Sequence, residues 1–173
     1  IINSNVWYTG APVSNYALKG YTTFARLNKD RQPMVYVGGN DGMLHGFSMA
    51  DGSEKIAYVP KGVIRQLGRL ADPTFDDRHL YYVDGSPFTG DVDTATGDIL
   101  DAAYVPDWRT MLVGTLGAGG KGYFVLDVTN PGTTSGGASN FTEANAKTLV
   151  VMDKTLHASD TIPNCDAITN ATD

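Results

Sequence analysis

The sequence predicts an all-β protein that contains about two four-stranded blades of a larger β-propeller. Two stretches with the same order of features predict this fold. In residues 34–49, MVYVGGNDGMLHGFSM, two runs rich in β-branched and aromatic residues flank Asn40-Asp41-Gly42, which supplies the positive-φ positions of a hairpin turn. Residues 110–127, TMLVGTLGAGGKGYFVLD, repeat that order around a longer glycine loop at residues 117–122. A repeat on this scale indicates a fold class before any single motif does.

Each predicted hairpin has a strand-like segment before it and another after it. Residues 2–10, INSNVWYTG, resemble residues 83–90, VDGSPFTG, and each segment is expected to form the first strand of its unit. Residues 55–60 and 147–152 are expected to form the fourth strands. Four-stranded sheets repeated along a chain are the unit of a β-propeller. The alternative is an ordinary antiparallel meander whose glycine turns align by chance.

The two blade-like units span about residues 1–60 and 83–153. Residues 1–154 are therefore expected to form a partial β-propeller, and residues 155–173 a divergent or truncated tail. Because a propeller closes its ring with at least about four blades, and two blades leave sheet edges exposed, we expect the chain to be part of a larger protein. Its first residues, Ile1-Ile2, fit this expectation, since they show neither an initiating methionine nor a signal peptide.

A short helix is predicted between the two units. Val63, Leu67 and Leu70 recur at helical intervals in residues 61–71, KGVIRQLGRLA. The segment follows Pro60, a residue that favours the start of a helix. We therefore expect an amphipathic helix that covers the sheets with its apolar side.

The composition fits a globular β-protein and excludes some classes of function. Hydrophobic residues make up 42% of the chain and charged residues 18%, with 20 glycines for turns. The formal net charge of −6 argues against nucleic-acid binding, which needs a clustered basic surface. No apolar run approaches the roughly 20 residues of a membrane-spanning helix. The single cysteine, Cys165, either pairs outside this segment or remains a free thiol.

Several motifs occur together in the order found in one known family. They are residues 1–6, IINSNV; 33–47, PMVYVGGNDGMLHGF; 82–87, YVDGSP; 108–110, WRT; and 117–131, GAGGKGYFVLDVTNP. This set resembles the C-terminal β-propeller domain of the PilY/PilC family of type IV pilus assembly and tip-adhesin proteins, over residues 1 to about 153. The resemblance implies a modified seven-bladed, quinoprotein-like propeller in a large exported protein.

The resemblance also implies a function and a location. It implies a non-enzymatic module that supports pilus assembly or extension and attachment to a host-cell or abiotic surface. The implied partners are the pilin or minor pilins of a type IV pilus. The implied location is the cell surface, the outer membrane or the pilus tip.

Calcium is possible in the parent propeller, because the family's propeller is similar to others that bind calcium in an Asp-rich loop. The nearest match in this chain is residues 91–101, DVDTATGDILD, with Asp91, Asp93 and Asp98 as candidate ligands. The match is incomplete, since Ala95 replaces an oxygen ligand, the glycine is one place late and no glutamate closes the loop. A solvated acidic turn is the other interpretation, and no cofactor is expected within this segment.

The alternative function is that of a quinoprotein-like oxidoreductase. The first hairpin and the following Asp51-Gly52-Ser53-Glu54 also resemble the repeats of quinoprotein propellers. Such an enzyme needs metal and cofactor ligands that converge on the central channel, with an aspartate as general base. Trp108 and Arg109 could stack on and pair with an anionic cofactor, whereas packing is the commoner role of such a tryptophan. We expect no catalytic residues in this chain.

The remaining motifs are expected to be structural. His45, His79 and His157 lie far apart without the spacing of a zinc site, and His45 is expected to be a packed or capping residue. The glycine loop at residues 117–122 joins two strands, so turn formation explains it better than phosphate binding does.

Three long loops are expected to present side chains to pilin-like partners or to an external surface. They span residues 71–82, 93–107 and 129–146, and the last is rich in Gly, Ser, Thr and Asn, with a helical turn predicted near Glu143. The candidate partner-binding residues are Phe75, Asp76, Asp77, Tyr104 and Trp108.

Overall fold

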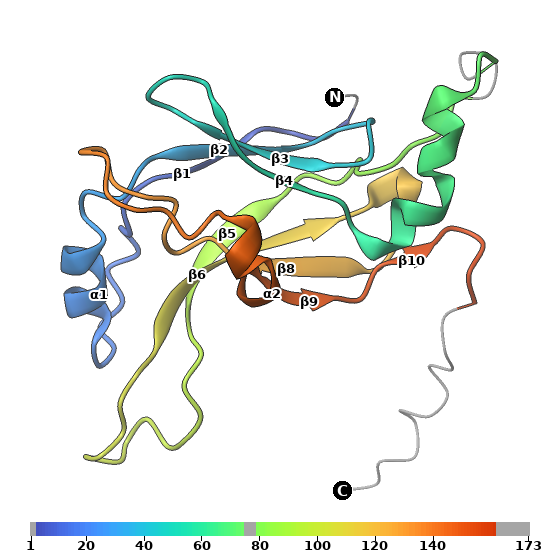
Figure 1. Ribbon diagram of the computed structural model, residues 1–173. Coiled ribbons are helices and arrows are strands. Elements are labelled where there is room, and N and C mark those ends of the chain that lie inside the picture. The colour runs from blue at the N-terminus through green and yellow to red at the C-terminus, as the bar shows by residue number, and fades with distance from the viewer. Residues whose placement is uncertain (1–2, 75–78, 162–173) are drawn as a thin grey trace, which may run out of the picture.

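Two antiparallel four-stranded sheets form the body of the protein (Figure 1), as seen in a computed structural model that describes residues 3–74 and 79–161. The first sheet contains β1 (Trp7–Thr9), β2 (Met34–Gly38), β3 (Leu44–Ser48) and β4 (Glu54–Tyr58), in chain order. The second contains β5 (Phe88–Asp93), β6 (Trp108–Thr115), β8 (Tyr123–Asp127) and β9 (Val150–Asp153), also in chain order. The predicted pair of four-stranded units is therefore confirmed.

The first hairpin forms where it was predicted, with a turn that differs in one respect. The backbone N–H of Gly39 donates a hydrogen bond to the carbonyl of Met43, over 2.8 Å. Gly42 has a φ of 96°, but Asn40 and Asp41 do not adopt the positive φ expected of them. Asp41 instead accepts a hydrogen bond from the Met43 N–H through its carboxylate, which holds the turn without left-handed backbone at that residue.

The glycine loop of the second hairpin is more than a turn. It contains η3 (Gly117–Gly119) and β7 (Gly120–Lys121), and β7 pairs with β10 (Leu156–His157) in a small antiparallel sheet. The first residues after position 154 are thus attached to the second sheet's hairpin.

The first strands are shorter or shifted relative to the predicted segments. β1 begins at Trp7 and β5 at Phe88, each several residues later than the repeat suggested. The segments before them lie side by side, because the Ser4 hydroxyl donates to the carbonyl of Gly85 (3.2 Å) and the Asn5 N–H donates to the Ser86 hydroxyl (2.9 Å). Equivalent positions of the two repeats therefore contact each other between the blades.

The fourth strand of the second unit is also displaced. Residues 147–149, expected to be strand, belong to α2 (Ala146–Leu149), which follows the predicted helical turn η4 (Glu143–Asn145). Leu149 is buried, and the Thr148 hydroxyl donates to the carbonyl of Asn145. Burial of the leucine and this local hydrogen bond both favour the helical turn over an extended chain.

Two further helices lie at opposite ends of the sheets. The predicted helix at residues 61–71 is present as η1 (Lys61–Ala71), but it is a 3-10 helix instead of an α-helix. As the spacing predicted, Val63 is fully buried and Leu67 and Leu70 pack against the core. Gly62 lowers α-helical propensity and lies against the backbone of β10, which leaves no room for a Cβ atom. α1 (Tyr21–Leu27), in the connection between β1 and β2, was not predicted.

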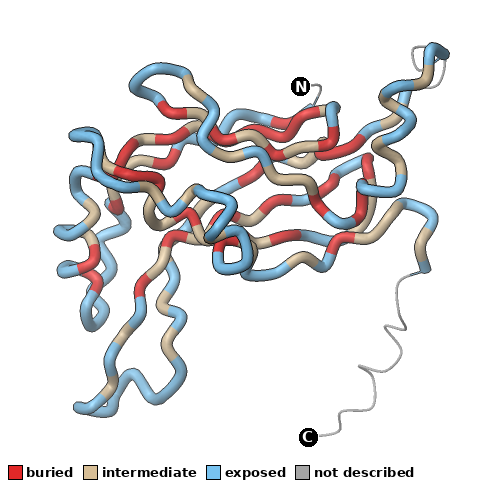
Figure 2. The backbone as a smooth tube through the Cα atoms, in the orientation of Figure 1, coloured by how far each residue is buried: buried red, intermediate tan, exposed pale blue. Residues whose placement is uncertain are grey.

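The core lies between the two sheets, and buried residues alternate along the strands (Figure 2). Tyr58 and Phe124 contact each other across the sheets, with ring centroids 5.1 Å apart. The buried apolar residues of the main core are Met34, Tyr36, Leu44, Val63, Tyr82, Val83, Leu112, Leu116, Phe124, Leu126 and Val128. One face of each sheet thus supplies the interior, as binary alternation along strands requires.

The connections differ in length at the two ends of the sheets. The α1 end carries the long connections at residues 10–33, 94–107 and 128–149, whereas η1, β7 and β10 lie at the opposite end (Figure 1). Among the residues that the structure describes, no helix has the length and apolar character needed to cross a membrane.

Candidate functional site

Asp91, a candidate metal ligand, belongs to a hydrogen-bonded network between the blades. Its carboxylate accepts hydrogen bonds from the hydroxyls of Tyr21 and Thr110, each over 2.7 Å. The buried guanidinium of Arg31 donates to Thr110 (2.6 Å) and to the carbonyl of Gly10. Burial lowers the pKa of Arg31, while the nearby charge of Asp91 opposes that shift. Burial and the bond to Asp91 raise the pKa of Tyr21. These contacts attach α1 and the segment before β2 to the second blade.

Asp93 and Asp98 have separate structural partners. Asp93 accepts hydrogen bonds from the Tyr104 hydroxyl (2.7 Å) and from the Asp107 N–H (2.8 Å), which closes the base of the β5–β6 loop. Asp98 accepts one from the Leu100 N–H within the loop. In residues 3–74 and 79–161, no three or more His, Cys, Asp or Glu side chains gather in a way that could hold a metal ion. A metal role for these aspartates stays a prediction.

Trp108, a candidate contact residue, is packed inside the α1 end. It is 8% exposed, and its indole N–H donates to the carbonyl of Lys19. Its ring is edge-on to that of Tyr21, with the ring centroids 4.9 Å apart. The structure thus favours the packing role of Trp108. Tyr104 is half-buried, with its hydroxyl bound to Asp93.

The other candidates of that set, Phe75, Asp76 and Asp77, lie outside the described residues, as does Cys165. Of the predicted loops, residues 129–146 are tied to the first blade. The Gln32 N–H donates to the carbonyl of Gly132 (2.8 Å), so part of this loop bridges the blades.

Trp108 and Arg109 do not form the arrangement that an anionic cofactor would need. Neighbouring residues of a strand point to opposite faces, and Arg109 pairs with Asp107 (2.9 Å) and Asp127 (3.2 Å). Hydrogen bonding to Asp107 raises the pKa of Arg109. The guanidinium is therefore occupied by two carboxylates.

His45 lies in an ion-pair cluster that sequence reasoning missed. Its Nδ1 is 2.5 Å from the carboxylate of Glu54, its Nε2 is 2.9 Å from that of Asp41, and its ring stacks on Phe47. Partial burial opposes protonation, but hydrogen bonds to Glu54 and Asp41 outweigh it and raise the pKa of His45. The spacing of Asp41 and His45 was visible in the sequence, but the pairing with Glu54 depends on the register of β3 and β4.

Residues 1–154 match the protein family described as the PilY1 beta-propeller domain. The chain belongs to this family. The match includes both four-stranded sheets and η1, so these sheets are blades of a PilY1-type β-propeller. The predicted family and the predicted all-β fold class are confirmed.

Similar PilY1 proteins are much longer than this chain. The chain is 42% identical over 139 residues to the type IV pilus biogenesis factor PilY1 homolog of Xylella fastidiosa strain Temecula1, covering 76% of this chain and 10% of that relative. It is 46% identical over 112 residues to the type IV pilus biogenesis factor PilY1 of Pseudomonas aeruginosa strain PAO1, covering 64% and 9% respectively. The crystal structure of the Pseudomonas aeruginosa PilY1 C-terminal domain is 40% identical, with a TM-score of 0.49, over 72% of this chain and 23% of that chain. The chain thus spans about a tenth of the length of these curated relatives.

The PilY1-type blades expose apolar side chains at the α1 end that sequence reasoning did not select. Ile99, Leu100 and Val105 are exposed in the β5–β6 connection. The signal was present, since these residues stand between aspartates in the sequence DILDAAYVPD, where a solvated loop needs no large apolar side chains. Within the part of the chain that the structure describes, the exposed end of this connection is the candidate partner-binding site.

Proposed function

We propose that this chain is a non-enzymatic β-propeller module of a type IV pilus biogenesis factor. The observation that carries the proposal is the family match over residues 1–154, together with relatives that are named type IV pilus biogenesis factors. The module acts in pilus assembly or extension and in attachment to a host-cell or abiotic surface at the pilus tip. Its protein partners are the pilin or minor pilins of the same pilus system.

The architecture supports this proposal through its rigid sheets and its long connections. Paired strands and a shared core hold the two blades, while the connections at residues 10–33 and 94–107 extend from one end (Figure 1). Loops on a rigid scaffold are where proteins most often place their binding residues. A position at the outer membrane, the cell surface or the pilus tip would make these connections accessible to partners.

The contacts of the polar residues also support a binding role over an enzymatic one. Asp91, Asp93, Arg31 and Arg109 each have partners that connect elements of the fold. The alternative, a quinoprotein-like oxidoreductase, shares the propeller repeat, but a shared repeat indicates a shared fold and not a shared catalytic activity.

Purified full-length protein provides the test of this proposal. We expect it to bind purified soluble pilin or minor pilin subunits of its own pilus system in biolayer interferometry. We expect this binding to be lost when the segment numbered 1–154 in the present sequence is deleted from the full-length protein. We expect no dehydrogenase turnover with quinone cofactor and an artificial electron acceptor. If the full-length protein shows dehydrogenase turnover and the deletion variant does not, the proposal is wrong and the oxidoreductase alternative is favoured.

A further inference from the structure

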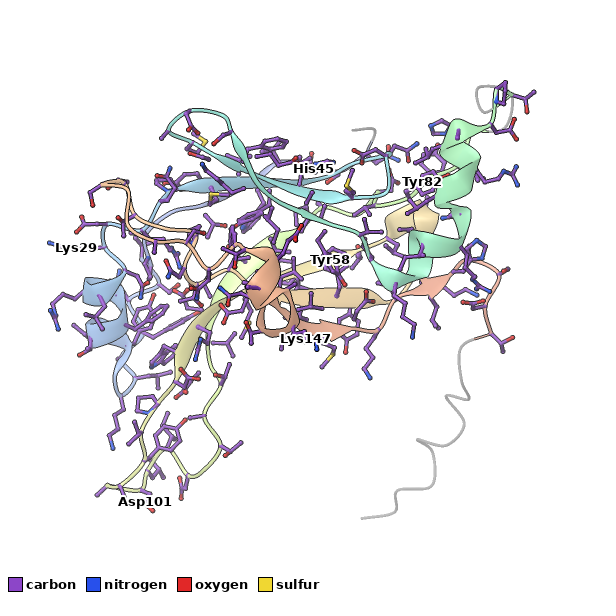
Figure 3. All side chains as sticks on the ribbon, in the orientation of Figure 1. Lys29, His45, Tyr58, Tyr82, Asp101 and Lys147 are labelled. Carbon is purple, nitrogen blue, oxygen red and sulfur yellow. The ribbon has the colours of Figure 1, made fainter. Side chains whose placement is uncertain are left out.

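The β5–β6 connection, residues 94–107, presents large apolar side chains to solvent. Leu100 is 88% exposed and Val105 is 78% exposed, and Ile99 is also exposed. A connection of this length in a compact domain is usually functional. Figure 3 shows that it extends beyond both sheets, with Asp101 at its far end.

Hydrogen bonds hold this connection in one shape. At its base, the Thr94 N–H donates to the carbonyl of Asp107 (2.9 Å), and the Tyr104 hydroxyl donates to Asp93. Farther out, the Lys19 ammonium donates to the carbonyl of Ala102 (3.0 Å). An apolar surface that is ordered before binding loses less conformational entropy when a partner covers it.

A neighbouring segment extends the same surface. Val13, Tyr16 and Leu18, in the connection between β1 and α1, are exposed. This segment lies against the β5–β6 connection, because the Lys19 ammonium donates to the carbonyl of Ala102 (3.0 Å). It also lies against the start of β6, where the ring centroids of Tyr16 and Trp108 are 5.7 Å apart. We call these exposed residues the α1-end surface: Val13, Tyr16, Leu18, Ile99, Leu100 and Val105.

Two exposed aspartates give the outer part of the β5–β6 connection a negative charge. Asp98 and Asp101 accept local backbone hydrogen bonds, whereas the other aspartates of residues 91–107 are bound to side chains of the fold. Residues 91–107 contain five aspartates and no lysine or arginine, and residues 11–20 contain one lysine. That lysine, Lys19, is already engaged with backbone carbonyls of the β5–β6 connection. Opposite charges steer association and select partners. The rim therefore favours a basic partner and disfavours anionic lipid headgroups.

We propose that the α1-end surface binds a protein whose own surface has an apolar groove bordered by lysine and arginine. The apolar side chains supply the area that is removed from water, and the exposed Asp98 and Asp101 pair with the basic border. This inference rests on the proposed function when it identifies the partner as a pilin or minor pilin of the same system.

The test compares two variants of the full-length protein, with substitutions at opposite ends of the sheets. Leu100→Asp places a charge on the α1-end surface, and Ile64→Asp places one at an exposed position of η1, at the opposite end. Both side chains are exposed, so both variants are expected to keep the unmodified circular dichroism spectrum and melting temperature. Purified pilin and minor pilin subunits serve as the immobilised probes.

We expect Leu100→Asp to weaken pilin binding by about tenfold or more, as loss of a central apolar contact does, while Ile64→Asp leaves it unchanged. Raising the salt concentration should also weaken binding by the unmodified protein. If Leu100→Asp and the unmodified protein bind pilin equally well, the α1-end surface is not the binding surface, and the proposed function is unaffected. If the unmodified protein binds no pilin subunit, both the binding surface and the proposed function are contradicted. If it binds anionic vesicles and no pilin subunit, the surface is a lipid-binding surface.

Discussion

His45 connects the β2–β3 turn to β4 through the carboxylates of Asp41 and Glu54. Because these contacts raise the pKa of His45 above its usual value of 6.5, the folded state holds the proton more tightly than the unfolded chain does. The resulting stabilisation is fully present below pH 6.5 and is lost as the pH rises through the raised pKa. Its size is limited because the two carboxylates are exposed to water.

We predict that His45→Gln lowers the free energy of unfolding by up to about 1 kcal/mol near pH 5.5 and by much less near pH 9. Urea unfolding of the unmodified protein and the variant at both pH values measures the difference. An equal loss at both pH values would show that packing on Phe47, and not the charge of the ring, accounts for the role of His45.

Asp153 joins the end of the second blade to the end of the first. Its carboxylate accepts hydrogen bonds from the Tyr58 hydroxyl (2.6 Å), the Lys61 N–H (2.7 Å) and the Thr155 N–H (2.8 Å). Burial opposes the charged form, but these donors together lower the pKa of Asp153. Its contribution to stability should therefore disappear only as the pH falls well into the acid range.

We predict that Asp153→Ala lowers the free energy of unfolding by about 2 to 3 kcal/mol, because several donors lose a charged acceptor at once. The matched control is Asp98→Ala, which removes an exposed carboxylate with one local backbone partner and should cost far less. Denaturant titration at neutral pH compares the two variants. Similar losses would contradict a specific role for Asp153 at the junction.

Each sheet contains a glycine opposite a buried aromatic residue on the neighbouring strand. Gly46 faces Tyr36 between β3 and β2, and Gly114 faces Phe124 between β6 and β8. A Cβ atom would lie 2.7 Å from the Tyr36 ring at the first position and 2.1 Å from the Phe124 ring at the second. The same strand pair of each blade therefore uses glycine to make room for a core aromatic side chain.

We predict that Gly114→Ala destabilises the protein by about 1 to 3 kcal/mol, because the Phe124 ring must move within a close-packed core. Gly90→Ala is the control, since Gly90 lies in β5 and a Cβ atom there meets nothing within 4 Å. Thermal unfolding distinguishes the two variants. A melting temperature for Gly114→Ala equal to that of Gly90→Ala would disprove the close approach.

At the scale of the whole molecule, the sequence revealed the features that depend on local pattern. Both hairpins, the fourth strands in outline and the amphipathic spacing of η1 follow from alternation and from turn residues. α1 was missed because its seven residues bury only Tyr21 and Phe24, and because the N-cap residue before them, Gly20, has no side chain to cap the helix. Packing against Trp108, distant in sequence, stabilises this helix, and such contacts are not visible in a local pattern.

The candidate site was predicted less completely than the fold. The sequence indicated the loop at residues 93–107, but it selected Trp108, which is buried, and passed over Leu100, which is exposed. Whether an apolar residue faces water depends on how its segment lies against the rest of the chain. The pairing of His45 with Glu54 likewise required the strand register.

Counting surface pili tests the central claim most directly, namely that this propeller module serves type IV pilus biogenesis. Cells that lack the full-length gene are complemented with the unmodified gene or with one lacking residues 1–154, and export of both proteins is checked by immunoblotting. We predict that the exported shortened protein fails to restore surface pili, whereas the unmodified protein restores them. Normal numbers of pili with the shortened protein would contradict the claim.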